Sequence, residues 1–156
     1  MHTADLCDEH RDRIVVADSI FQFFGKKNAF HGPIYTLKVY EDNLLVRNAL
    51  RTIPEESVLV IDGGGSRRSA IVGDNLAEIA VQRKLAGMVI NGCIRDSHQI
   101  NEMDVGIYAL GTNPIKSKKQ GLGYESISVG FAGVNFTPGS FLYADRDGIV
   151  VAKHQL

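Results

Sequence analysis

The stretch GDNLAEIAVQRKLAGMVINGCIRD, from Gly73 to Asp96, decides how the fold is interpreted. Its apolar residues first recur at helical spacing, which predicts a helix from about Asp74 to Leu85. The short apolar run Gly87–Asn91 begins at a glycine and is typical of a buried strand. A polar loop carrying Arg95 and Asp96 is expected to follow it.

A second apolar run upstream, Val58–Asp62, predicts another buried strand, closed by the glycines at 63–65. Strand, helix and strand together make a βαβ unit. In such a unit the helix begins at the sheet edge where the first strand ends, and the second strand returns to that edge. We therefore expect the free backbone N–H groups at 74–76 to face the same crevice as Arg95 and Asp96, where a small anion could bind.

The rest of the chain predicts a mixed α/β protein with a largely β second half. Thr3 is expected to cap a short helix that runs to His10, and Asp42 or Asn43 to cap a helix over 44–50 that stops before Pro54. Strands are expected at 32–40, 105–110, 127–131, 134–136, 141–143 and 149–151, the last four as antiparallel strands and hairpins. The type of the apolar segments 14–16 and 20–24 stays open, and the phenylalanines at 21, 23 and 24 suit either the core or an interface. A polar loop is expected over 113–123.

Composition narrows the classes of function. The 156 residues are enough for one domain, 1–156, and the formal net charge of −1 argues against binding nucleic acid by neutralising phosphates. Only two cysteines occur, Cys7 and Cys93, so a disulfide framework is not expected, which favours a reducing cytoplasm. No signal-peptide run or membrane-spanning stretch is visible, and we expect a soluble cytoplasmic protein.

Several other motifs have weaker support. The run GGGSRR, which begins at Gly63, lacks the Lys-Ser/Thr ending of a phosphate-binding loop, and we interpret it as a turn that permits close backbone approach. The five histidines form no pair at metal-ligand spacing. Cys93 has no evident histidine partner, and there is no Gly-x-Ser-x-Gly motif. The lysines at 116, 118 and 119 are interpreted as residues of a solvated loop.

Arg95 and Asp96 are stronger candidates because they fall where the βαβ unit places the anion crevice. Arginine holds a carboxylate or a developing oxyanion through its planar guanidinium, and aspartate is a hard oxygen ligand suited to Mg²⁺ or Mn²⁺. Two plainer interpretations stay open, a surface ion pair and a cap by Asp96 on a short helix within 97–103.

The runs DGGGSRRSAIVGDNLAEIAVQRKLAGMVINGCIRD, MDVGIYALGTNPIKS and LYADRDGIVVA occur in this order. Together they resemble the regulators of RNase E activity and the related 4-hydroxy-4-methyl-2-oxoglutarate aldolases, and the likeness covers nearly the whole chain. The resemblance implies an α/β/β sandwich like that of swivelling phosphohistidine domains, with a βαβ unit followed by antiparallel strands. The implied assembly is a ring-shaped homotrimer, or a dimer of such trimers.

The resemblance also implies an activity, that of a divalent-metal-dependent lyase on 2-oxo acids. Such an enzyme splits 4-hydroxy-4-methyl-2-oxoglutarate to pyruvate or decarboxylates oxaloacetate. On this chain the implied catalytic residues are Arg95, which binds the substrate near its keto oxygen, and Asp96, which ligates Mg²⁺ or Mn²⁺. The implied substrate-binding groups also include four backbone amides, those of Gly73, Asp74, Asn75 and Leu76.

Two features depart from the pattern of the family's enzymes. An acidic residue tends to follow the metal-binding aspartate by three positions, where this chain has Gln99. Longer aldolases also carry a C-terminal extension, whereas this sequence ends at Leu156. The competing expectations are a non-catalytic regulator that binds an RNA-degrading enzyme and an anion-binding module without turnover; neither binds nucleic acid directly or a membrane.

Overall fold

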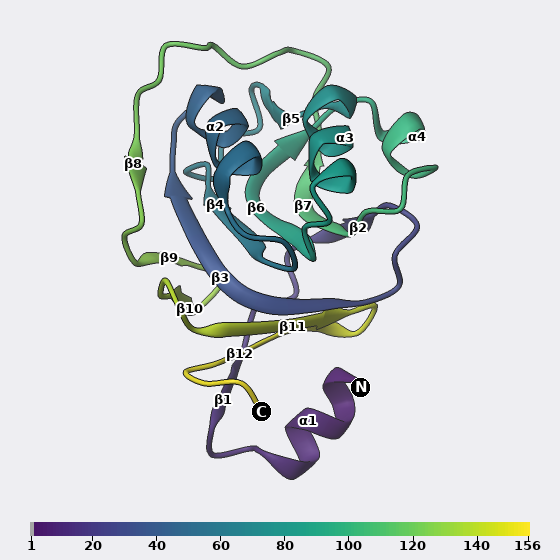
Figure 1. Ribbon diagram of the computed structural model, residues 1–156, viewed down its shortest axis with the longest axis vertical. Coiled ribbons are helices and arrows are strands. Elements are labelled where there is room, and N and C mark those ends of the chain that lie inside the picture. The colour runs from purple at the N-terminus through teal and green to yellow at the C-terminus, as the bar shows by residue number, and fades with distance from the viewer. Residues whose placement is uncertain (1) are drawn as a thin grey trace.

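A curled mixed sheet forms the centre of the molecule (Figure 1), in a computed structural model that describes residues 2–156. The helices are α1 (Thr3–Glu9), α2 (Leu44–Thr52), α3 (Asp74–Gln82) and α4 (Ser97–Ile100). The first six strands are β1 (Ile14–Val16), β2 (Gln22–Phe24), β3 (Phe30–Lys38), β4 (Val58–Asp62), β5 (Ala70–Val72) and β6 (Gly87–Ile94). The others are β7 (Ile107–Thr112), β8 (Tyr124–Glu125), β9 (Val129–Phe131), β10 (Val134–Phe136), β11 (Phe141–Asp145) and β12 (Gly148–Ala152).

The parallel part of the sheet contains the predicted βαβ unit. Strands β3, β4, β6 and β7 lie side by side and run parallel. Strand β4 has the predicted bounds and is buried along its whole length. The sequence did not reveal β5, which pairs with the end of β6 at Cys93 and Ile94, beyond the point where the pairing of β4 stops. Strand β5 therefore continues the position of β4 and leads directly into α3.

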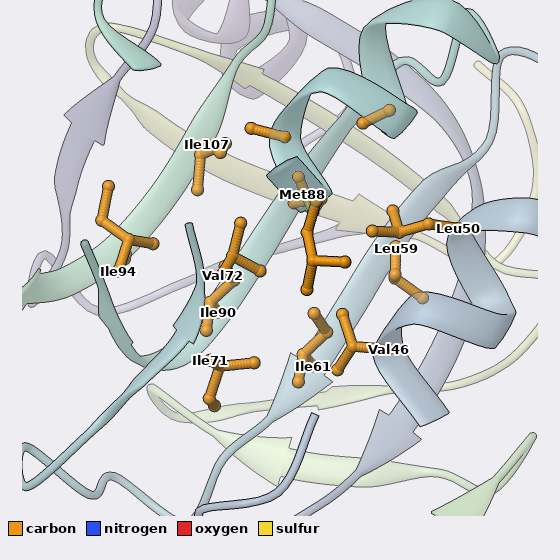
Figure 2. Close-up of a cluster of buried hydrophobic side chains, with 14 of the residues drawn as sticks. Val46, Leu50, Leu59, Ile61, Ile71, Val72, Met88, Ile90, Ile94 and Ile107 are labelled. Carbon is orange, nitrogen blue, oxygen red and sulfur yellow. The ribbon is translucent and has the colours of Figure 1, made fainter. Parts of the chain in front are cut away.

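Helices α2 and α3 cover one face of the parallel strands, and apolar side chains fill the space between them (Figure 2). Val46 and Leu50 come from α2, and Leu59, Met88 and Ile107 reach them from the sheet. All five side chains are fully buried. Burial of this kind contributes about 25 cal/mol for each Å² of apolar surface removed from water. The layer fixes α3 against the sheet, and thereby fixes the position of its first turn.

The opposite face of the sheet packs on a second β layer. Strand β3 passes from its parallel partner β4 to an antiparallel pairing with β11, and β12 and β1 follow in order. Phe136, Leu142 and Val151 of this layer pack against Val60 and Val89 of the parallel strands. The late strands are antiparallel as predicted, in the pairs β9–β10 and β11–β12.

The phenylalanines left open between core and interface belong to the core. Phe24 is buried, and Phe21 and Phe23 are half-buried and pack edge-on against Tyr108. The guanidinium of Arg146 lies 4.2 Å from the centre of the Phe23 ring, close enough for a cation–π interaction. These contacts place the three phenylalanines in or against the core, whereas Ile20 of the same run is 46 % exposed.

Several predicted boundaries are wrong by a few residues. The strands predicted at 32–40 and 105–110, for example, are β3 (Phe30–Lys38) and β7 (Ile107–Thr112). Helix α3 ends at Gln82 rather than near Leu85, because Lys84 adopts a left-handed conformation with φ of 54°. The Arg83 side chain then donates to the carbonyls of Leu50 and Ile53, at 2.7 and 2.8 Å. Strand β6 extends three residues beyond Asn91 because it pairs with β5 on one side and β7 on the other. Helix α4 is a single turn over Ser97–Ile100, within the range 97–103 in which a short helix was expected.

The prediction that Thr3 caps α1 is also wrong. His2 holds the cap position, and Thr3 is the first residue of the helix. The amide and hydroxyl of Thr3 donate to the two carboxylate oxygens of buried Asp145, at 2.8 and 2.7 Å. Asp145 therefore attaches α1 to the outer face of the β11–β12 pair, at the end of the molecule where both termini lie (Figure 1).

Replacing Asp145 by Asn is expected to destabilise the fold by about 1–3 kcal/mol at neutral pH, the cost of disrupting a buried hydrogen-bonded group. Burial raises the pKa of Asp145, but hydrogen bonds from Thr3 and Asp147 outweigh it, so the pKa lies below its ordinary value. A lowered pKa gives stability that is present above about pH 4 and is lost as the pH falls further. Urea unfolding at pH 7 and pH 3 should show the difference from wild type shrinking in acid. Asp8→Asn, an exposed change on α1, serves as the control.

None of the helices within residues 2–156 combines the length and the apolarity needed to cross a bilayer.

Candidate functional site

The first turn of α3 and the pair Arg95–Asp96 lie against each other, although about 20 residues separate them in the chain. The amide of Asp74 donates to Oδ2 of Asp96 at 3.0 Å, and Nε of Arg95 lies 4.0 Å from the same oxygen. A Cβ atom on Gly73 would stand only 2.8 Å from that oxygen and 3.3 Å from Cγ and Nε of Arg95. Glycine at position 73 thus allows these groups to meet.

Strand pairing brings Arg95 and Asp96 to this place. The amide of Arg95 donates to the carbonyl of Val72 at 2.9 Å, so the end of β6 is attached to the residue just before the turn into α3. Asp96 then adopts a left-handed conformation with φ of 57°. It occupies the cap position of α4 but makes no side-chain hydrogen bond there. Its carboxylate accepts instead from α3, which answers the open question of whether Asp96 caps the helix that follows it.

Two of the four backbone amides proposed to hold the substrate have acceptors from the protein. The Asp74 amide donates to Asp96, and the Asn75 amide donates to Oδ1 of Asp74 at 2.8 Å. The expectation that both are free is therefore not met in this structure. The positive end of the helix dipole still points at this crevice, and it favours a negative charge there. An incoming carboxylate would bind beside the Asp96 carboxylate, or it would replace the Asp96 carboxylate as the acceptor of the Asp74 amide.

A pocket of about 180 Å³ opens in front of the α3 terminus. Besides residues 73–76 and Arg95, it is lined by Asn43, Leu44, Arg47, Ala70, Ile79, Lys116, Ser117 and Lys119. Four of the lining side chains are cationic and only Asp74 is acidic, so the pocket attracts anions. Within residues 2–156, neither Arg47 nor the two lysines form an ion pair.

The three lysines are exposed loop residues, as interpreted from the sequence, and two of them have a further role that the sequence did not indicate. Lys116 and Lys119 line the pocket, whereas Lys118 does not. Arg47 was missed altogether. It lies on the exposed side of the short helix α2, and nothing in its local sequence links it to Arg95. Only the packing of α2 beside α3 brings it to the same pocket.

The segment 113–123, which we call the strap, forms one wall of the pocket. In Figure 1 it is the green stretch that runs along the top of the view from β7 to β8. The carbonyl of Ile115 accepts from the amide of Ala70 at 2.7 Å, and the hydroxyl of Ser117 donates to the Ala70 carbonyl at 2.7 Å. Further along, the Lys118 amide donates to the carbonyl of Glu41 at 2.9 Å. The predicted polar loop is therefore attached to the sheet at several points.

The residues at the site fit a weakly held divalent metal better than a fully coordinated one. Residues 2–156 contain no group of three His, Cys, Asp or Glu side chains placed to hold a metal. Asp96 is half-exposed, and the Asp74 amide donates to its Oδ2 rather than to its Oδ1. Mg²⁺ is commonly held by one or two carboxylates, waters and the substrate itself. A single aspartate ligand suits that arrangement. Neither Asp96 nor the exposed Gln99 lines the pocket itself, and Asp96 borders it through its contacts with Asp74 and Arg95.

The other sequence motifs lie outside this pocket. Oδ1 of Asp62 accepts from the amide of Gly64 at 2.9 Å and from the side-chain amide of Asn91 at 3.0 Å, which closes a turn after β4. Gly64 and Gly65 have positive φ values of 67° and 73°, as expected for a turn built on glycine. Cys93 is buried in β6 rather than placed in a loop, and burial raises the pKa of its thiol. A thiol in that state is a poor nucleophile.

Known proteins resemble this chain over its whole length. A relative from Aromatoleum aromaticum, named "Putative 4-hydroxy-4-methyl-2-oxoglutarate aldolase", is 51 % identical over 99 % of this chain and 97 % of its own. A crystal structure from Geobacillus kaustophilus, named as an S-adenosylmethionine:2-dimethylmenaquinone methyltransferase, is 53 % identical with a TM-score of 0.98, covering 100 % of this chain and 97 % of its own.

A third similar protein carries yet another name. The structure of the RNA-processing inhibitor RraA from Thermus thermophilis is 38 % identical with a TM-score of 0.96, covering 100 % of this chain and 94 % of its own. The three names agree on no single activity, whereas the structures share one mixed α/β fold. The model of the RraA-like family, described as Aldolase/RraA, matches residues 3–151. The chain therefore belongs to the RraA-like family.

Proposed function

We propose that this protein is a divalent-metal-dependent lyase that acts on 2-oxo acids, as a 4-hydroxy-4-methyl-2-oxoglutarate aldolase or an oxaloacetate decarboxylase that releases pyruvate. The observation that carries the proposal is that Arg95 and the α3 terminus line one cationic pocket, and that the Asp96 carboxylate contacts both of them beside it. The name of the Aromatoleum relative supports an aldolase. The pocket supports the proposal with positive groups that suit a substrate carboxylate and the negative charge that would develop on the adjacent keto oxygen.

The chain's own residues bind the substrate and stabilise charge. In aldol cleavage a base takes the proton of the substrate's hydroxyl, that carbon–oxygen bond becomes a carbonyl, and the electron pair of the broken carbon–carbon bond stays on the pyruvate fragment as an enolate. In decarboxylation carbon dioxide leaves and the same enolate remains. A proton then converts the enolate to pyruvate. The guanidinium of Arg95 lines the pocket and can donate two parallel hydrogen bonds, which would stabilise the negative oxygen of the enolate. The helix dipole of α3 and the strap lysines favour the same charge. Protein donors aimed at a developing oxyanion are worth roughly 10²–10³ in rate each.

Asp96 is the residue that would hold Mg²⁺ or Mn²⁺, with waters and the substrate completing the shell. A divalent ion at that position supplies Lewis-acid polarisation of the keto group. Its weak protein ligation predicts that the metal exchanges readily and that a chelator removes it.

A side-by-side assay tests the proposal. Oxaloacetate and 4-hydroxy-4-methyl-2-oxoglutarate are each incubated with the protein, with and without Mg²⁺ or Mn²⁺, and pyruvate is measured with a coupled dehydrogenase. Blanks without protein subtract any reaction of the substrate with free metal. We expect metal-stimulated pyruvate release that chelation abolishes and metal restores. Equal rates with protein and with the blank for both substrates would refute the lyase proposal.

A second function is favoured by one specific observation, the close match to the RNA-processing inhibitor from Thermus. The alternative proposal is a protein that binds an RNase E-type nuclease and inhibits it without catalysis. A purified nuclease of this type should then be captured and slowed equally by wild type and by Asp96→Asn. Capture by neither protein would rule this function out.

We also propose that the protein assembles as a ring-shaped homotrimer, or as a dimer of trimers. Apolar side chains exposed on the strap and just after it support an interface, among them Leu122 and Tyr124, each 66 % exposed. Light scattering on the eluting peak of a sizing column should give three or six times the chain mass of 17.1 kDa. A stable monomer would contradict this assembly. We also propose that the protein is located in the cytoplasm.

A further inference from the structure

Asp42 is a buried carboxylate that lies outside the pocket but is attached to its wall. Only 2 % of its surface is exposed. Its two oxygens accept from the amides of Gln120 and Gly121 in the strap, at 2.8 and 3.1 Å, and from the amide of Leu44 in the first turn of α2, at 3.2 Å. One side chain thereby joins the strap to the start of the helix that carries Arg47.

The carboxylate of Asp42 is ionised at neutral pH. Burial raises its pKa, but the hydrogen bonds from Gln120, Leu44 and Gly121 outweigh this effect, and the pKa lies below its ordinary value. Hydrogen bonds to an ionised acceptor are about twice as strong as neutral ones. The attachment of the strap is therefore strong for a surface segment of this length.

The neighbouring residue reinforces the same attachment. Glu41 has a positive φ of 54°, which is uncommon for a residue with a side chain. Its carbonyl accepts from the Lys118 amide, and its carboxylate accepts from the Ser66 hydroxyl at 2.6 Å and from Nε of Arg68 at 2.8 Å. The backbone turn that directs Asp42 toward the strap is thus held by the strap at Lys118 and by the side chains of Ser66 and Arg68.

Lys119 lies between two attachment points of the strap, and Lys116 lies just before the first of them. Ser117 holds one side of the strap to Ala70, and Asp42 holds the amides at 120 and 121. Both lysines line the pocket together with the α3 terminus and Arg95. The pocket therefore has positive charge from two separate sources, one at α3 and β6 and the other at α2 and the strap.

We propose that Asp42 is a positioning residue that sets the affinity of the pocket for ligands with a second negative charge, namely dicarboxylic 2-oxo acids. It does so by holding the strap lysines across from Arg95. This inference rests on the proposed function for the class of anion. A volume of about 180 Å³ equals the liquid volume of roughly six water molecules, enough for a small dicarboxylate.

Binding measurements test the inference without requiring turnover. Calorimetric titration compares 2-oxoglutarate, a dianionic 2-oxo acid, with the monoanion pyruvate, each in the presence of Mg²⁺. Asp42→Asn keeps the shape of the side chain but loses its charge and one acceptor. We expect 2-oxoglutarate to bind about tenfold more weakly to this variant, while the Kd of pyruvate changes by less than about twofold.

Two further variants separate positioning from a loss of structure. Lys119→Gln should weaken 2-oxoglutarate in the wild-type background and have much less effect in Asp42→Asn, because the lysine is already displaced there. Ser117→Ala removes the hydrogen bond from the strap to the Ala70 carbonyl. It should selectively weaken binding of the dianion, and this test remains usable even if Asp42→Asn folds poorly. Asp8→Asn is the control, exposed on α1.

The outcomes are distinct from those of the lyase assay. Equal weakening of both ligands, or additive effects of the Asp42 and Lys119 changes, would overturn the positioning role even if pyruvate is released normally. Selective loss of dianion binding in a protein without turnover would uphold the role while the lyase proposal fails.

Discussion

Asp96→Asn is expected to lower metal-stimulated pyruvate release about a hundredfold or more, since a metal-bound transition state is worth several kcal/mol and each 1.4 kcal/mol is about tenfold in rate. The substitution removes the charge that would attract the metal. It leaves one side-chain oxygen able to accept from the Asp74 amide, so the first turn of α3 should keep its place. The measurement is kcat at saturating substrate over a series of Mg²⁺ concentrations.

The control for this prediction is a change of the same type far from the site. Asp8→Asn removes one exposed carboxylate on α1, at the opposite end of the molecule from α3 (Figure 1). It should retain the wild-type rate and its metal dependence. If Asp96→Asn folds with the wild-type melting temperature and still responds to Mg²⁺ with an unchanged kcat, Asp96 is not the metal ligand.

The second large effect is expected from Gly73→Ala. Alanine can adopt the extended backbone of this residue, with φ of −118° and ψ of −167°. Its Cβ, however, would lie 2.8 Å from Oδ2 of Asp96 and 3.3 Å from the Arg95 side chain, so both must move by several tenths of an ångström. Displacement of catalytic groups by about 1 Å can cost on the order of 10²-fold in rate. We expect kcat to fall by roughly 10- to 100-fold.

Stability should not follow activity in this variant. Replacing Gly by Ala where the backbone permits it restricts the unfolded chain and stabilises a protein by about 0.4–1 kcal/mol. The melting temperature of Gly73→Ala should therefore stay close to that of the wild type. Gly130→Ala is a matched control, because its Cβ would lie 3.1 Å from the exposed side chain of Asn135 and 4.0 Å from the carbonyl oxygen of Val134. Full activity in Gly73→Ala would show that Arg95 and Asp96 need not hold their observed positions.

The local pattern of the chain predicted much of the fold. Apolar periodicity located β4 with its correct bounds and placed the start of α3 at Asp74. The connection rules for a βαβ unit then brought Arg95 and Asp96 to that start, as the Asp74–Asp96 hydrogen bond shows. These features depend on residues that are neighbours in the sequence and on the general handedness of strand connections. Both can be used when only one sequence is known.

Features that depend on distant pairing were not predictable in the same way. Strand β5 has three residues and exists because the end of β6 offers it a partner. The placement of Lys116 and Lys119 depends on hydrogen bonds to Ala70 and Asp42, each more than 40 residues away along the chain. A lysine in such a loop has the same local signature whether it faces solvent or a ligand.

The contacts of Arg83 at the end of α3 have a further consequence for binding. Its guanidinium bridges to the last carbonyls of α2, at Leu50 and Ile53, and so joins the two helices between which the pocket opens. The gap between these helices is fixed before any ligand arrives. The pocket walls then lose less conformational entropy when a ligand binds, so less of the interaction free energy is offset by ordering them. Affinity in this protein should therefore respond more to the charge of the ligand than to its ability to draw the helices together.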